Sequence, residues 1–131
     1  MKNCDYFSFR FRFIETDLNW TAYSTGWSWI TKDGLFSAWS VGAGSFAHYK
    51  DVTPKEALET LQKYPITTAE FHISLYLKAL DSEDLRSFKF PTLRRCFIGG
   101  EPLNKEVVRK WKEDTGVELW DCYGLTETIR S

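Results

Sequence analysis

Apolar residues alternate with polar ones, or recur at helical spacing, along most of the chain, and this pattern predicts a succession of strands and helices. Residues 7–13 (FSFRFRF) alternate aromatic with polar side chains, which predicts a strand with one apolar face. Residues 23–47 are rich in Gly, Ser and Trp and contain a turn signal, DG. We expect a helix through the small residues that follow this turn, and then a short strand at 45–49.

The clearest helix start in the sequence lies at Thr53. This residue is a good N-cap, Pro54 suits the first helical position, and Glu56 completes a capping box. The sequence therefore predicts a helix over 54–63, followed by a strand over 66–71.

The second half of the chain continues the alternation of helices and strands. Asn104 is a good N-cap, Gly116 is a good C-terminal stop, and Leu103 and Val108 are spaced as a hydrophobic staple. The predicted elements are a helix at 73–80, a short polar helix at 81–88, a strand at 93–98, a helix at 104–116 and a strand at 117–123. This order predicts the α/β class, with alternating strand–helix units that form a mostly parallel sheet.

Length and composition fit one folded domain. The 131 residues are 43% hydrophobic and 17% aromatic, so disorder is not expected. The net charge of −1 comes from interspersed acidic and basic residues, which gives no attraction to nucleic acid or to an anionic membrane. No apolar run in the sequence is long enough for a transmembrane segment.

The cysteines and the N-terminal segment give information on the cellular compartment of the protein. Cys4, Cys96 and Cys122 form no Cys-x-x-Cys pair, so we expect reduced thiols rather than a disulfide framework or a zinc site. The segment MKNCDYFSFRFRF lacks the apolar core of a secretory signal, and its period of two makes it a poor mitochondrial presequence.

Two predicted strands end in segments that could bind a ligand, since ligands of open α/β sheets bind beyond the carboxyl ends of the strands. GGEP follows the strand at 93–98, and YGLTET follows the strand at 117–123. Each segment has a glycine that lets the backbone approach a ligand. Tyr123 offers a flat face for a base, Thr126 a hydroxyl for a phosphate oxygen, and Glu127 a carboxylate for Mg²⁺.

A structural interpretation of the same residues stays open. Gly124 is compatible with a simple turn, Thr126 and Glu127 with an ordinary helix start, and GGEP with a tight turn. His48 and His72 have no acid or cysteine at ligand spacing, so neither is predicted to bind a metal or to act in catalysis.

The tryptophan-rich segment offers two further candidates. STG at 24–26 begins like a phosphate-binding loop, but Trp27 follows where more glycine and a lysine are needed. We expect Trp27, Trp29 and Trp39 to belong to the core, or else to the wall of an apolar pocket.

Several segments occur together, in order and with consistent spacing. They are TGW, WSVGAGSFAHY, KYPIT, FKFPTLRRCFIGGEPL and TGVELWDCYGLTET. Together they resemble the adenylate-forming superfamily and, within it, the medium-chain acyl-CoA synthetases. The resemblance covers residues 17–128, and YG-x-TE is its most specific motif. It implies a partial AMP-binding domain over residues 17–131, preceded by a non-matching segment at 1–16.

This resemblance implies an AMP-forming acid–thiol ligase of fatty acid metabolism. In such an enzyme a carboxylate attacks the α-phosphate of ATP to give an acyl-adenylate and pyrophosphate. The thiol of coenzyme A then displaces AMP. The implied small molecules are a carboxylic acid, ATP with Mg²⁺, and coenzyme A.

Particular residues also receive roles from the resemblance. Thr126 would contact the α-phosphate and the acyl carboxylate, and Glu127 would ligate Mg²⁺, so these two are the implied catalytic residues. Trp27 would wall the acyl pocket. The residues implied to bind the adenine side of the nucleotide are Gly100, Glu101, Pro102, Asp121, Cys122, Tyr123, Gly124 and Leu125, with the ring of Tyr123 stacking on the base.

Three positions depart from the family pattern. Ser24 stands where an Asp usually precedes TGW, Ile73 replaces a proline, and Leu125 replaces a common Gln. Because Ile73 replaces this proline, the resemblance does not determine the shape of the acyl pocket.

The triphosphate-gripping loop and the C-terminal domain of the family have no counterpart in these 131 residues. We therefore expect an internal fragment of the amino-terminal domain, inactive as an isolated chain. One alternative is a non-catalytic nucleotide-binding or interaction module that pairs with a full-length homologue, with FSFRFRF adding as a strand. Another is a non-functional truncated product. The resemblance implies the mitochondrial matrix, whereas the N-terminal segment leaves the cytoplasm open.

Overall fold

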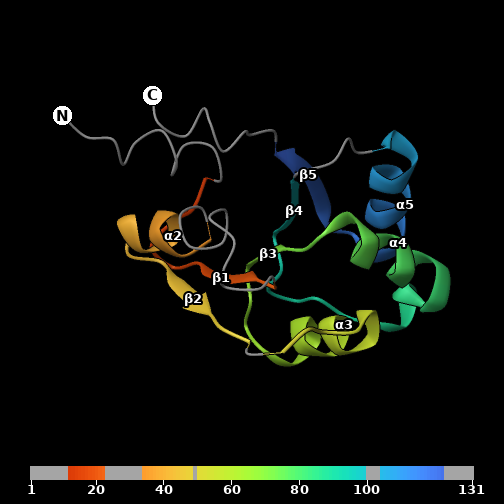
Figure 1. Cartoon of the computed structure of the whole chain (residues 1–131), viewed down its shortest axis with the longest axis horizontal. Coiled ribbons are helices and arrows are strands. Elements are labelled where there is room, and N and C mark those ends of the chain that lie inside the picture. Colours follow the sequence, from red (N-terminus) through yellow and green to blue (C-terminus); the bar gives the residue numbers. More distant parts are fainter. Residues whose placement is uncertain (1–11, 23–33, 49, 100–103, 123–131) are drawn as a thin grey trace.

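A parallel sheet organises the chain. The computed structural model describes residues 12–22, 34–48, 50–99 and 104–122, and in these residues five strands form one parallel sheet in the order β2-β1-β3-β4-β5 (Figure 1). The strands are β1 (Leu18–Thr21), β2 (Gly44–Phe46), β3 (Thr68–Glu70), β4 (Arg95–Gly99) and β5 (Glu118–Cys122). The predicted α/β class with a mostly parallel sheet is confirmed.

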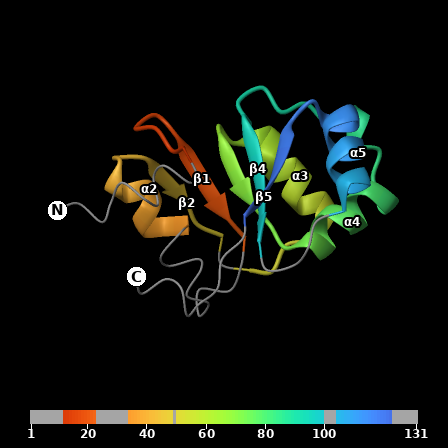
Figure 2. The same ribbon diagram turned by 90° about the horizontal axis from the view of Figure 1, so that it is seen from above.

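Helices lie on both faces of this sheet. They are α2 (Ser37–Ser40), α3 (Pro54–Lys63), α4 (Ile73–Ser82) and α5 (Lys105–Thr115), with a short 3-10 turn, η2 (Leu85–Ser87), before β4. In Figure 2, α2 lies on one side of the sheet, and α3, α4 and α5 lie on the other. The chain steps from β1 to β2 in one direction and then returns toward β3, β4 and β5, so right-handed crossovers place α2 opposite the other helices.

The larger core fills the space between the sheet and the helices α3, α4 and α5. Trp20 of β1 is fully buried there, with ring centroids 5.0 Å from Phe71 and 5.4 Å from Phe46 in edge-to-face geometry. Tyr76 of α4 packs on Trp111 of α5 in the same manner at 4.9 Å. The smaller cluster, on the α2 side, contains Phe13, Ala38, Ala43, Phe97 and Cys122.

Local capping signals place two helices correctly. α3 has the predicted bounds, and the capping box between Thr53 and Glu56 is formed in both directions. Asn104 caps α5, and Gly116 ends that helix in the left-handed conformation. These ends depend on neighbouring residues alone, which is why the sequence locates them.

Other predicted elements differ from the observed ones. β1 was missed, because its four residues, LNWT, are too few to show a period. The polar helix predicted at 81–88 is wrong, since α4 continues to Ser82 and only η2 follows. The strands predicted at 45–49 and 66–71 are shorter in the structure, as β2 and β3. Residues 12–13, the described end of the strand predicted at 7–13, belong to no strand.

The core position expected for Trp39 is wrong. Trp39 lies on α2 with 54% of its surface exposed, and it packs edge-to-face on Phe36, which is 55% exposed. Ser37 and Ala38 are the buried residues of this short helix, so Trp39 lies on its outer side. Trp27 and Trp29, and Leu103 of the predicted staple, lie outside the described residues.

A partly buried ion pair, in which Asp17 is buried and Arg94 reaches the surface, joins the residues that precede three of the strands. The carboxylate of Asp17, just before β1, accepts hydrogen bonds from Arg94 Nη2, which lies 2.6 Å from each of its oxygens. The Thr67 hydroxyl donates to the same carboxylate at 2.7 Å, and the Ile14 amide donates at 2.9 Å. Because Thr67 precedes β3 and Arg94 precedes β4, this cluster fixes how β1, β3 and β4 enter the sheet.

Replacing Gly116 with alanine is expected to lower the free energy of unfolding by about 1 kcal/mol. Gly116 has a φ of +74°, and an added Cβ would meet nothing within 4 Å, so the cost is conformational rather than steric. Chemical denaturation measures this loss of stability. Gly116→Asn is the matched control, because asparagine adopts the left-handed conformation more readily than alanine does. Equal losses in the two variants would contradict the explanation.

Candidate functional site

The strand order identifies the part of the sheet where a ligand has room. From β1 the chain crosses to β2 over one face, and from β2 it crosses back to β3 over the other face. Helices therefore diverge at the carboxyl ends of β1 and β3, which is the topological switch point of this sheet. Sheets with the order 2-1-3-4-5 bind ligands in the crevice at that point.

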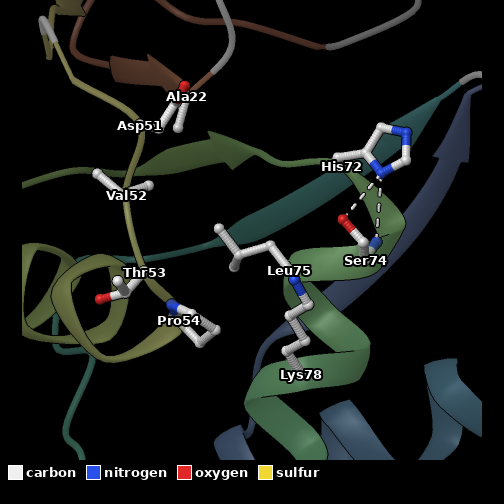
Figure 3. Close-up of a pocket in the computed structure, with 9 residues that line it drawn as sticks. All are labelled: Ala22, Asp51, Val52, Thr53, Pro54, His72, Ser74, Leu75 and Lys78. Carbon is white, nitrogen blue, oxygen red and sulfur yellow. Dashed lines mark hydrogen bonds between the residues drawn. The ribbon is translucent and has the colours of Figure 1, made fainter.

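A pocket of about 420 Å³ lies at this switch point (Figure 3). It is bordered by the end of β1, by the segment that leads into α3, and by the first turns of α4. The lining residues are Ala22, Asp51, Val52, Thr53, Pro54, His72, Ser74, Leu75 and Lys78.

The lining combines an apolar floor with a polar rim. Val52 and Leu75 point toward each other across the pocket in Figure 3. Asp51 and Lys78 bring opposite charges to the rim. The amino ends of α3 and α4 also border the pocket, and helix amino ends favour negative or electron-rich groups. An apolar chain with a polar or anionic end suits this lining.

His72 contributes to the pocket as the N-cap of α4. Its Nδ1 accepts a hydrogen bond from the Ser74 amide at 3.3 Å and lies 3.1 Å from the Ser74 hydroxyl, as the dashed lines in Figure 3 show. No metal or catalytic role was predicted for His72 from the sequence, which also did not indicate the pocket. The signal available in advance was a strand end at Phe71 followed by a polar residue that could begin a helix.

The two segments singled out from the sequence leave the sheet side by side. β4 and β5 pair in parallel, with Ile98 opposite Asp121 and Gly99 opposite Cys122. The segments that follow, GGEP and YGLTET, therefore start from neighbouring strand ends on the same edge as the pocket. The predicted site residues Trp27, Gly100, Glu101, Pro102, Tyr123, Gly124, Leu125, Thr126 and Glu127 lie outside the described residues.

The two predicted site residues that the structure describes differ in their surroundings. Asp121 is exposed at the end of β5, where its carboxylate is open to a polar group. Cys122 is buried in the cluster on the α2 side, so its side chain is part of the packing there. Cys96 is buried too, and burial raises the pKa of its thiol to about 12. Neither thiol is in a disulfide.

No group of three or more His, Cys, Asp or Glu side chains that could hold a metal occurs among the described residues. Mg²⁺ is often held by one or two carboxylates together with substrate phosphates, so a single acid such as Glu127 fits this chemistry.

Among the residues that the structure describes, no helix is long and apolar enough to cross a membrane.

Comparison with known proteins decides the family. The sequence matches the family described as "AMP-binding enzyme" over residues 6–130. The chain belongs to the AMP-binding enzyme family. This AMP-binding family member is 38% identical over 117 residues to "Acyl-coenzyme A synthetase ACSM3, mitochondrial" of Rattus norvegicus. It is 43% identical over 119 residues to "Acyl-coenzyme A synthetase ACSM5, mitochondrial" of Homo sapiens.

Each of these alignments covers 88% of the AMP-binding family member and 20% of the relative, so the chain spans about a fifth of the length of the curated relatives it matches. Among solved structures it is similar to the anthranilate CoA ligase AuaEII, determined in complex with anthranoyl-AMP. That similarity has a TM-score of 0.80 and 25% identity, and it covers 89% of this chain and 23% of the ligase. The resemblance predicted from the sequence is confirmed at the level of the family and the fold.

Proposed function

We propose that the chain supplies part of the nucleotide site of an AMP-forming acid–thiol ligase, which activates a medium-chain carboxylic acid with ATP and transfers the acyl group to coenzyme A. The observation that carries this proposal is the pairing of β4 with β5, which starts GGEP and YGLTET from adjacent strand ends. Similarity to acyl-coenzyme A synthetases over most of the chain supports the reaction class.

The proposed roles follow from the chemistry of each group. The backbone of Gly100, Glu101 and Pro102 contacts adenine from the β4 side, and the ring of Tyr123 stacks on it from the β5 side. Asp121, Cys122, Gly124 and Leu125 complete the adenine site. Of these, the exposed Asp121 offers a side chain, whereas Cys122 contributes main chain because its thiol is buried.

The proposed reaction needs charge stabilisation as the acid carboxylate approaches the α-phosphate. The Thr126 hydroxyl donates a hydrogen bond to a phosphate oxygen and orients the carboxylate. Glu127 holds Mg²⁺, which when bound offsets the charge of the phosphates. Trp27 walls the acyl pocket. The pocket at the switch point, with its apolar floor and Lys78 on its rim, lies on the same edge of the sheet and admits a carbon chain with a polar end.

For the isolated chain we expect nucleotide binding without catalysis. ATP–pyrophosphate exchange with hexanoate should be undetectable, because positioning of the reacting groups needs more than these residues provide. Calorimetric titration should show AMP binding that Tyr123→Ala weakens about tenfold, since the stacked ring is lost. Tyr123→Phe, which keeps the ring, is the matched control. Robust exchange would contradict the expected inactivity, and equal binding by both variants would contradict the stacking role.

A second candidate function is a non-catalytic module that pairs with a full-length homologue. The exposed aromatic pair formed by Trp39 of α2 and Phe36, the residue before α2, favours it, because such a pair is suited to burial against a partner. Titration of the chain with a full-length acyl-CoA synthetase tests this candidate. Binding that Trp39→Ala abolishes would support it, and no heat of binding would exclude it.

The proposed compartment is the mitochondrial matrix. The names of both relatives describe them as mitochondrial. Expression of the tagged chain in cells, followed by organelle fractionation, tests the compartment directly.

A further inference from the structure

The amino end of α4 is held by a histidine at the rim of the pocket. The main-chain amide and the hydroxyl of Ser74 both reach His72 Nδ1, at 3.3 Å and 3.1 Å. The cap residue has extended backbone angles (φ −65°, ψ 147°), as an N-cap requires. Serine, threonine, aspartate and asparagine are the usual N-caps, and none of them changes charge near neutral pH as histidine does.

Only the neutral imidazole can form this cap. An amide N–H needs an acceptor, and Nδ1 accepts only while it carries no proton. The Ser74 hydroxyl can rotate and accept from a protonated ring, but the amide cannot reverse. The protonated ring also places a positive charge at the positive end of the α4 dipole, and the first turn of α4 contains no acidic residue to offset it.

We infer that His72 is a pH-sensitive cap, which fastens the first turn of α4 when neutral and releases it when protonated. Ser74, Leu75 and Lys78 project from the first turns of this helix into the pocket lining, so release changes the pocket wall (Figure 3). The pocket therefore has its ordered shape while the His72 ring is neutral. This inference is independent of what the pocket binds.

Other charged groups border the same pocket. They are Lys78 on α4 and Asp51 in the segment that leads into α3, and Glu70 lies buried at the end of β3, two residues before His72. The other histidine, His48, lies near Lys50 with Nδ1 3.0 Å from the Lys50 carbonyl oxygen. Any pH-dependent effect of these groups on the first turn of α4 has to be distinguished from the effect of His72.

Amide exchange by NMR magnetisation transfer on the 131-residue chain tests the cap between pH 8 and pH 5.5. The exchange rate of the Ser74 amide, divided by its intrinsic rate at each pH, should rise about fivefold as the pH falls, which corresponds to loss of one N-cap. The His72 ring signals and the Ser74 amide shift should change with the same midpoint. A flat ratio in the unmodified chain would overturn the inference.

Matched variants assign the effect to the histidine. His72→Asn keeps an acceptor that does not titrate, so its ratio should stay low at every pH, whereas His72→Ala should give a high ratio at every pH. His48→Asn, Asp51→Asn, Glu70→Gln and Lys78→Gln should each retain the fivefold change. The same change in His72→Asn, or its loss in any of these four control variants, would show that another group causes it.

Discussion

Replacing Trp20 with alanine is expected to lower the free energy of unfolding by about 4 kcal/mol, the largest loss for any single change considered. The side chain is fully buried at the centre of the larger core, where it contacts Phe71 and Phe46 edge-to-face. Its removal forfeits the transfer free energy of the indole and leaves a cavity that the rigid strands on either side cannot fill. Urea denaturation followed by circular dichroism measures the loss.

Two further tryptophan variants make that result specific. Trp20→Phe keeps an aromatic ring and should lose about half as much, which remains measurable where the alanine variant fails to fold. Trp39→Ala removes an indole that is 54% exposed and should change stability by less than about 0.5 kcal/mol. Similar losses at positions 20 and 39 would show that the core is not arranged as described.

Replacing Arg94 with glutamine is expected to lower the free energy of unfolding by about 2 kcal/mol. The carboxylate of Asp17 is fully buried and loses both hydrogen bonds from Arg94 Nη2, while those from Thr67 and Ile14 remain. Arg86→Gln is the matched control, because Arg86 pairs with Asp114 at 2.9 Å but is largely exposed. The control should lose less than about 1 kcal/mol.

The Arg94 effect should depend on pH in a defined direction. Burial alone would raise the pKa of Asp17, but hydrogen bonds from Arg94, Thr67 and the Ile14 amide hold it below its ordinary value of 3.8. The ionised carboxylate therefore stabilises the fold above that value, and this contribution disappears as the pH falls through the lower pKa of the folded state. The stability difference between the unmodified chain and Arg94→Gln should shrink as the pH is lowered from 5 toward 2. A constant difference over that range would contradict the role of the ion pair.

The elements that the sequence predicted well are those whose ends depend on adjacent residues. Thr53 and Glu56 bond to each other across three positions, and Gly116 follows its helix directly, so a short window contains the whole signal. β1 is different, because what makes LNWT a strand is its pairing with β2 and β3. Asn19 is buried there, and its side-chain oxygen accepts a 2.8 Å hydrogen bond from the hydroxyl of Thr68, which lies 49 residues later in the sequence. No local pattern contains that contact.

The candidate site shows the same division between local and distant causes. The sequence indicated GGEP and YGLTET as strand-end segments, and the alternation of helices and strands was enough to put both on one edge of the sheet. The pocket at the switch point depends instead on strand order, which brings Ala22, Val52 and Leu75 together from three separate segments. Strand order is a property of the whole chain, and periodicity does not reveal it.

The place of β1 in the sheet also governs when the protein can fold. β1 is the earliest described strand along the chain, yet it lies between β2 and β3. The Leu18 amide donates its hydrogen bond to the hydroxyl of Thr67, which comes 49 residues later. Arg94, which neutralises Asp17, follows 77 residues after it. On the ribosome, the edge of β1 that pairs with β3 therefore stays unpaired until residues 68–70 have been made, although β2, the partner of its other edge, follows earlier. Sheet assembly becomes a late and slow step, and the interval before it is when the nascent chain is most open to edge-to-edge aggregation.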